Sequence, residues 1–310
     1  MWENLACASQ FDGSELSGCI LRQVLDVALQ QWKPASPLEI ERTYFGAENL
    51  KGQIVVTGGF NLDYKALYST EIYDVLSDTW TSGPELQYAR RNLSTAQLKG
   101  RVYAVGGYDS QELLASVEAL DPRMRSWTEV GSAFMLIPHF CAPMLSCRSS
   151  ASCCVADDNT LYVMGGTSGE VRFFLVRSQR LNTMEAYDIR MDKWTAFSSD
   201  LLHVRSAGAA VKVLGSIYAF GGTDNSHKVH NSLEIFTMEL KSWRFGAQMP
   251  SARFDHAACS ISDSVVTTGG QDGSTVLPVV DFYRPELDTW QKGPNMVSPR
   301  YGHATVLASV

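Results

Sequence analysis

Short runs of alternating apolar and polar residues, separated by turn-forming residues, recur along the whole chain. One such run, 101–105, ends at Gly106-Gly107, and a run rich in small residues, such as 207–213, comes first in its unit. Alternation with a period of two between glycine-containing turns is typical of β-strands. A third run carries Glu71-Ile72-Tyr73-Asp74 and a fourth follows Trp80. The pattern therefore predicts a repeating unit of four short strands.

Large aromatic and glycine residues repeat with the same period, about fifty residues. The tryptophans at matching places are Trp32, Trp80, Trp127, Trp194, Trp243 and Trp290. The paired glycines ahead of five of them are Gly58-Gly59, Gly106-Gly107, Gly165-Gly166, Gly221-Gly222 and Gly269-Gly270. The large apolar residues seven positions before each tryptophan are Leu25, Tyr73, Leu120, Tyr187, Phe236 and Tyr283. This period with four strands per unit matches kelch repeats and predicts a β-propeller.

The two ends of the chain suggest how the ring closes. After Trp290, the segment 301–307 supplies only an innermost strand, while the N-terminal segment 6–13 starts partway through a unit. In that unit Ser9-Gln10 occupy the place of the glycine pair. We therefore expect an all-β, six-bladed kelch propeller, a single domain over 1–310. Its sixth blade would combine one C-terminal strand with three N-terminal strands and leave no free sheet edge.

Composition and charge exclude some function classes. The 310 residues are 45% hydrophobic and carry a net charge of −7, which argues against nucleic-acid binding. No apolar run approaches the roughly 20 residues of a membrane span, and no leader pattern is recognised. The seven cysteines are Cys7, Cys19, Cys141, Cys147, Cys153, Cys154 and Cys259. An odd number without C-x-x-C spacing favours reduced, buried thiols in a cytosolic protein over a disulfide framework.

An arginine stands just before each predicted innermost strand. These candidate partner-binding residues, with a neighbour of the second, are Arg42, Arg90, Arg91, Arg148, Arg205, Arg253 and Arg300. In a closed ring they would surround the channel mouth on one face and attract an acidic protein segment. The alternative is that each guanidinium anchors its loop by bonding carbonyls or a nearby acid. The acids available for this are Glu71, Glu118, Glu185, Glu234 and Asp281.

Two insertions interrupt the period, both in the third unit, at about 131–147 and 171–179. Strand direction places both on the face of the arginines. Their exposed apolar residues could contact a partner or a membrane surface. Translated non-coding sequence from an imperfect gene model explains them equally well, and both explanations stay open.

Candidate catalytic residues are few. His256 and His303 occupy equivalent places in adjacent units, and His227 and His230 share a loop. A metal site needs three or four converging ligands with supporting hydrogen bonds, so packing or loop roles are favoured for these histidines. We expect no enzyme activity, no cofactor and no metal site. A metal-dependent oxidase of kelch type remains a remote alternative.

Beyond the repeat skeleton, several linear segments resemble an apicomplexan BTB-kelch family associated with artemisinin susceptibility. The resembling segments are 61–67, Arg90-Arg91-Asn92, 123–127, 205–210 and 299–303. The resemblance covers nearly the whole chain except the insertions and about the first ten residues. It implies upstream coiled-coil and BTB regions, which are absent from this chain.

The resemblance also implies a function. Members of this family look like adaptors that engage cullin ubiquitin ligases through the BTB domain and recruit substrate through the propeller. It implies a cytoplasmic location at endocytic invaginations, called cytostomes or micropores, and partner contacts by the seven arginines. Positions tied to drug susceptibility correspond to Tyr73, Arg101 and Cys154, which we interpret as structural. A purely structural scaffold of the invagination, without a ubiquitin-ligase role, is the alternative.

Overall fold

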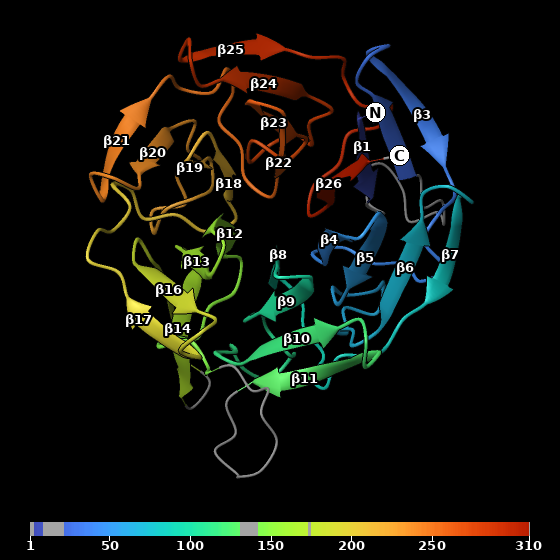
Figure 1. Ribbon diagram of the computed structural model, residues 1–310. Coiled ribbons are helices and arrows are strands. Elements are labelled where there is room, and N and C mark those ends of the chain that lie inside the picture. The colour runs from blue at the N-terminus through green and yellow to red at the C-terminus, as the bar shows by residue number, and fades with distance from the viewer. Residues whose placement is uncertain (1–2, 9–21, 131–141, 173–174, 310) are drawn as a thin grey trace.

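The computed structural model describes residues 3–8, 22–130, 142–172 and 175–309, and every regular element within them is a β-strand. Figure 1 shows the four-stranded sheets arranged radially as a ring around a central axis. Neighbouring strands within each sheet are antiparallel. The all-β propeller architecture expected from the repeat is confirmed.

Five blades are each built from consecutive stretches of the chain. Blade 1 contains β4 (Gly46–Leu50), β5 (Gln53–Thr57), β6 (Thr70–Asp74) and β7 (Thr79–Ser82). Blade 2 contains β8 (Ser94–Leu98), β9 (Arg101–Val105), β10 (Val117–Asp121) and β11 (Ser126–Val130). Blade 3 contains β12 (Ser152–Asp157), β13 (Thr160–Met164), β16 (Met184–Asp188) and β17 (Lys193–Ala196). Blade 4 contains β18 (Ala209–Val213), β19 (Ser216–Phe220), β20 (Leu233–Thr237) and β21 (Ser242–Gly246). Blade 5 contains β22 (Ala257–Ile261), β23 (Ser264–Thr268), β24 (Val280–Arg284) and β25 (Thr289–Lys292).

The two ends of the chain meet in a further four-stranded sheet, the terminal sheet. Its order is β26 (Ala304–Ser309), β1 (Glu3–Ala8), β2 (Arg22–Asp26) and β3 (Gln31–Ala35). β26 lies between β22 of blade 5 and β4 of blade 1, so the terminal sheet fills the space between these two blades (Figure 1).

This arrangement corrects the expected count of six blades to five. We use the word blade for a sheet with the full repeat: a glycine pair after the second strand and an acid in the third strand that pairs with the preceding arginine. In the terminal sheet Ser9-Gln10 replace the glycines in the sequence, and Gln23 takes the place of the acid. The terminal sheet therefore joins the ring without the repeat that defines the blades, and its segment 9–21 lies outside the described residues.

The hydrophobic core lies between neighbouring sheets, where the repeated tryptophans pack. Trp80 and Tyr73 are buried with their ring centroids 5.0 Å apart, and they pack with Val306 of the terminal sheet. The indole N–H of Trp80 donates to the Ser36 carbonyl at 2.9 Å, in the loop that enters the same blade. Trp127, Trp243 and Trp290 make the equivalent bond. These four tryptophans thus supply apolar area between sheets and also fix the loops that enter their blades.

The glycine pairs are required by the close approach of neighbouring loops. Gly58 and Gly59 have φ of 67° and 89°, in the left-handed region. A Cβ at Gly58 would lie 2.5 Å from the Arg90 carbonyl oxygen, and one at Gly59 would lie 2.6 Å from that of Thr43. Both the backbone conformation and the space therefore exclude a side chain.

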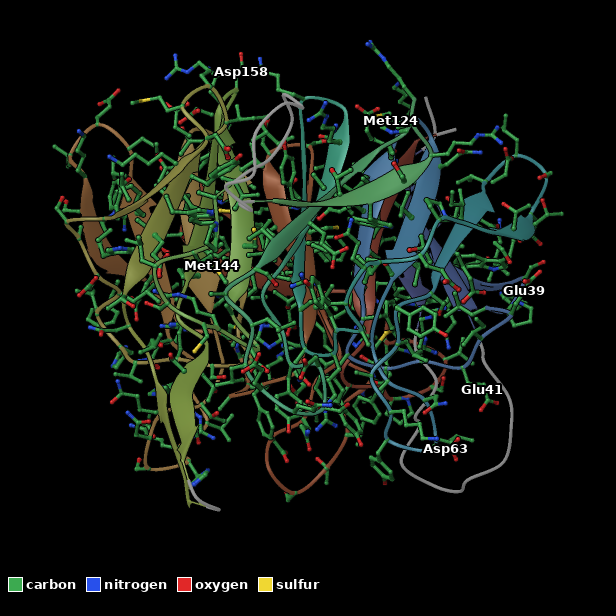
Figure 2. The ribbon with its side chains drawn as sticks, turned by 90° about the horizontal axis from the view of Figure 1, so that it is seen from below. Glu39, Glu41, Asp63, Met124, Met144 and Asp158 are labelled. Carbon is green, nitrogen blue, oxygen red and sulfur yellow. The ribbon has the colours of Figure 1, made fainter. Side chains whose placement is uncertain are left out.

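The insertion after Gly166 forms a hairpin, and the other insertion is largely undescribed. β14 (Thr167–Arg172) pairs with β15 (Leu175–Arg180), and Figure 2 shows this hairpin projecting at the same end of the molecule as Asp63. Residues 131–141 and 173–174 lie outside the described residues. Among the residues that are described, no helix is long and apolar enough to cross a membrane.

Candidate functional site at the channel mouth

The arginine before each innermost strand lies inside its blade. In blade 1, Arg42 is fully buried, and its Nη1 donates to the carbonyls of Gly58 at 2.8 Å and Ser69 at 2.9 Å. Its Nη2 donates to Glu71 Oε2 at 2.7 Å. The other oxygen of Glu71 accepts the backbone N–H groups of Glu39 and Ile40. One ion pair thereby joins the loop that enters the blade to the second and third strands.

The same ion pair recurs in every blade. The pairs are Arg42–Glu71, Arg90–Glu118, Arg148–Glu185, Arg205–Glu234 and Arg253–Asp281, all with both side chains buried. Burial lowers the pKa of Arg42, Arg205 and Arg253, and the paired acid opposes this shift in each case. Guanidinium groups stay charged even so, and each is neutralised locally by its acid.

Arg300 occupies the corresponding place before the terminal sheet. It is 2% exposed, and its Nη2 donates to Ser298 Oγ at 2.9 Å. Gln23 stands where the blades have an acid: its Oε1 accepts the Val297 N–H and its Nε2 donates to Ser298 Oγ.

The positions of the predicted arginines decide how much positive charge the mouth carries. Arg42, Arg90, Arg148, Arg205, Arg253 and Arg300 are all at most 2% exposed. The five arginines of the blades make the carbonyl and acid contacts of the loop-anchor interpretation, and Arg300 contacts the Ser298 hydroxyl. A ring of six exposed guanidinium groups, the premise of the expected positive field, is not what the structure shows.

Arg91 is the one residue of the predicted set that reaches the surface of the mouth. It is half-buried, and its Cζ lies 5.3 Å from the Phe60 ring centroid and 4.9 Å from that of Tyr108. Both rings directly follow a glycine pair. Stacking of a guanidinium on aromatic faces holds it in place and leaves its edge for hydrogen bonds.

A ring of backbone hydrogen bonds surrounds the axis at this face. Each of its six residues has φ between 49° and 59° and donates its N–H to the carbonyl of the next residue in the ring at 2.7–2.9 Å. In order of donation they are Tyr44, Gly302, Asp255, Ala207, Ser150, Asn92 and again Tyr44. Because every loop entering a sheet takes part, the ring fixes the loops relative to one another. A cavity of about 120 Å³ lies at this ring, and a channel of about 530 Å³ runs between the innermost strands.

Aromatic side chains gather on the side of the mouth formed by blade 1. Tyr44 stacks on Phe60 with centroids 5.7 Å apart, Phe60 stacks on Tyr64 at 5.6 Å, and Tyr301 meets Tyr44 edge-on at 6.1 Å. The Tyr44 hydroxyl donates to Asp255 Oδ2 at 2.8 Å, and Asp255 lies two places further along the ring. Burial raises the pKa of Asp255. Burial and, to a smaller extent, the negative charge of Asp255 raise the pKa of Tyr44.

The outer end of this stack is exposed. Leu62, Tyr64, Tyr68 and Tyr88 are between 40% and 69% exposed, and we call these four side chains the tyrosine surface. Sequence reasoning missed this surface because its residues follow no common repeat position. The only signal was an aromatic residue after the glycine pair in two units, Phe60 and Tyr108.

The histidines singled out in the sequence lie in two places. His256 and His303 are buried beside the first glycines of the preceding glycine pairs, and burial lowers their pKa, to about 3 for His303. The ring of His230 meets that of His203 at a tilt of 38° with centroids 4.9 Å apart, and the exposed His227 contacts Arg180 Nη2 at 3.2 Å. Within the described residues, no group of three or more His, Cys, Asp or Glu could hold a metal ion.

Four of the seven cysteines can be described, and each has a free thiol: Cys147, Cys153, Cys154 and Cys259. The last three line the channel. Burial raises the pKa of Cys154 to about 12, so its thiol stays protonated. The side chains of Cys7, Cys19 and Cys141 lie outside the described residues.

Comparison with known proteins places the fold in a family. Residues 54–309 match the family described as the Attractin/LZTR1 β-propeller. Beta-scruin of Limulus polyphemus is 30% identical over 110 residues, which cover 33% of this chain and 12% of that protein. Kelch-like protein 34 of Homo sapiens is 29% identical over 153 residues, covering 48% of this chain and 21% of the other. Kelch domain-containing protein 8B of Homo sapiens is 26% identical over 161 residues, covering 51% and 42%.

The solved structure of YjhT superposes with a TM-score of 0.70 at 12% identity, covering 88% of this chain and 90% of that one, which shows the shared fold. The chain matches less than half the length of these curated relatives. The family match over 54–309 agrees with the kelch-type blades and with the repeat of tryptophan and glycine. The chain belongs to the Attractin/LZTR1 β-propeller family.

Proposed function

We propose that this chain is a non-enzymatic protein-interaction module, one propeller domain over 1–310, that binds its partner at the mouth face. The observation that carries the proposal is the tyrosine surface. Tyr64, 69% exposed, ends an aromatic stack that rests on the ring of backbone hydrogen bonds. Exposed aromatic side chains held rigidly lose little entropy on binding and are enriched at protein interfaces.

A more specific role is an adaptor of the BTB-kelch type. The linear segments that resemble the apicomplexan family support a propeller that recruits a substrate or scaffold protein in endocytosis. In this proposal the BTB and coiled-coil regions lie outside the chain, a cullin ligase binds through the BTB region, and the module works in the cytoplasm at micropores or cytostomes. The similarity to Kelch-like protein 34 is compatible with such a kelch module.

The charge of the partner follows from the exposed side chains and not from the number of arginines. An acidic segment was expected because seven arginines precede the innermost strands. With six of them buried, such a segment would meet Arg91 alone among these residues. The mouth face therefore stays the proposed site, while the sign of its charge has to be argued separately.

A purely structural scaffold is the second candidate. One apolar side chain per sheet is exposed in the turn between the third and fourth strands. These residues, 56–82% exposed, are Leu29, Leu76, Met124, Met191, Leu240 and Leu287. Figure 2 shows Met124 at the end of the molecule opposite Asp63. A scaffold could use this outer rim without occupying the mouth.

Affinity capture from a lysate of the source cells separates the two candidates. Tyr64→Ala with Tyr68→Ala removes two exposed rings at the mouth, and Leu240→Ala with Leu287→Ala removes two exposed side chains at the opposite rim. Loss of specific partners only in the tyrosine variant supports the interaction module. Loss only in the leucine variant supports the scaffold, and partners unchanged in both contradict the proposal.

A further inference from the structure

The tyrosine surface spans two loops that are tied together. Leu86 N donates to the Tyr68 carbonyl at 2.8 Å and Arg90 N to the Leu67 carbonyl at 2.9 Å, which joins loop 58–69 to the loop before blade 2. Ala66 N donates to Ser110 Oγ at 3.3 Å, which adds the loop 106–116 of blade 2. The loops that carry the exposed rings are therefore connected to one another across blades 1 and 2.

The tip of this surface has a fixed shape. Asn61 Oδ1 accepts the N–H groups of Asp63 and Lys65, both at 3.2 Å, and Tyr64 N donates to the Asn61 carbonyl at 2.9 Å. The tip therefore holds Asp63 and Tyr64, two exposed residues, at adjacent positions of one fixed turn.

Uncompensated charge around the tyrosine surface is mainly negative. The carboxylates of Glu39, Glu41, Asp63 and Glu112 are at least partly exposed and make no ion pair or side-chain hydrogen bond with the described residues. Figure 2 shows Glu39, Glu41 and Asp63 on one side of the molecule, with Glu41 and Asp63 toward the mouth end. The cations on these loops that are not buried are Lys65 and Arg91, and the guanidinium of Arg91 already stacks on two rings.

The buried arginines add nothing to this field, because each blade's arginine is neutralised by its own acid. What a partner meets on this side is therefore an aromatic surface surrounded by carboxylates. Tyrosine faces and carboxylates both attract ammonium and guanidinium groups. Carboxylate-bearing partners would be repelled.

We infer that the tyrosine surface binds a protein segment that presents lysine or arginine side chains. This inference rests on the proposed function, since it names the chemistry of the partner at the same face. A cation of the segment would lie over Tyr64 and bond Asp63 and Glu41. Both contacts are solvent-exposed, so binding weakens as salt concentration rises.

Fluorescence anisotropy with labelled hexa-arginine and hexa-glutamate peptides tests the inference on the whole chain. Glu41→Gln with Asp63→Asn removes two carboxylates at the site. Asp158→Asn with Asp263→Asn removes two exposed carboxylates as the matched control, each from the turn between the first two strands of a blade. Figure 2 shows Asp158 at the end of the molecule opposite Asp63. We expect hexa-arginine to bind, with its Kd raised about fivefold by the site pair and less than about twofold by the control pair. Tyr64→Ala should weaken binding and Tyr64→Phe should not.

Three results would overturn the inference: no saturable hexa-arginine binding, an equal loss in the site and control variants, or tighter binding of hexa-glutamate. If hexa-glutamate binds more tightly and Arg91→Gln abolishes that binding, the mouth is still the interaction face, but its partner is acidic. All variants at the site change exposed side chains, and a cooperative melting transition for each checks that the fold is intact.

Discussion

Arg90 and Glu118 form an ion pair inside blade 2, with Arg90 Nε 2.9 Å from Glu118 Oε1 and neither side chain exposed. Glu118 also accepts the backbone N–H groups of Gln87 and Tyr88. The pair therefore connects the loop between two blades to the middle of a sheet. Its position explains why an arginine recurs at this place even where no partner could reach it.

Removing one member of this pair should destabilise the propeller strongly. Arg90→Ala leaves the Glu118 carboxylate buried with one fewer partner, and we expect the free energy of unfolding to fall by about 3–5 kcal/mol. Urea denaturation measures the loss. The control is Arg190→Ala, which breaks the exposed pair with Asp188 and should leave the free energy of unfolding almost unchanged. Equal losses in the two variants would contradict a buried anchoring role.

The ring of backbone hydrogen bonds predicts opposite effects at two equivalent positions. Ala207 has φ of 57° and Gly302 has φ of 59°. Ala207→Gly removes the strain of a Cβ in the left-handed region and should raise the free energy of unfolding by about 0.5–1 kcal/mol. Gly302→Ala should lower it by about 1–3 kcal/mol, because its Cβ would also lie 2.7 Å from Thr43 Oγ1. Thermal melting of both variants checks the pair, and shifts of the same sign would argue against the ring as a strained element.

The repeat made the fold predictable, and the blade count was wrong where the sequence departs from the repeat. The tryptophan and the large apolar residue at the Tyr73 position recur because each fills one place between sheets. The glycine pair recurs because neighbouring loops approach closely there, so spacing alone located the strands. The number of blades was overestimated because the strands expected at the two ends of the chain, with Leu25 and Trp32 at matching places, were counted as a sixth blade. At that place Gln23 and Ser9-Gln10 lack the acid and the glycines that define the others.

The candidate site was less predictable than the fold. Sequence spacing identified the arginines and also the acids that pair with them, such as Glu71, but it could not show that the pairs are buried. The stack of Tyr44, Phe60 and Tyr64 comes from two loops and meets Tyr301 from the far end of the chain. No local pattern signals such a contact, because ring closure alone brings these residues together.

Cys154→Tyr should overpack the space between blades 3 and 4. Cys154 is 7% exposed and packs in a cluster with Tyr162, Ile217 and Trp243. The added ring volume should lower the free energy of unfolding by about 1–3 kcal/mol. Differential scanning calorimetry measures this, with Cys154→Ser as the control for loss of the thiol. A tyrosine variant that melts no earlier than the wild type would contradict the packing interpretation.

Glu48 predicts a change of stability with pH. Its half-buried side chain lines the channel on β4, where burial raises its pKa from 4.5 to about 7, and a hydrogen bond from Thr95 opposes the shift. The folded state then binds more protons than the unfolded state between pH 4.5 and about 7, so the contribution of Glu48 to stability falls as pH rises through this window. Glu48→Gln cannot ionise and should remove this slope. We expect the variant to exceed the wild type by about 1–2 kcal/mol at pH 8 and to differ little at pH 4.5. Urea denaturation at both pH values measures the difference, and a variant that tracks the wild type at both would show that Glu48 ionises freely in the channel.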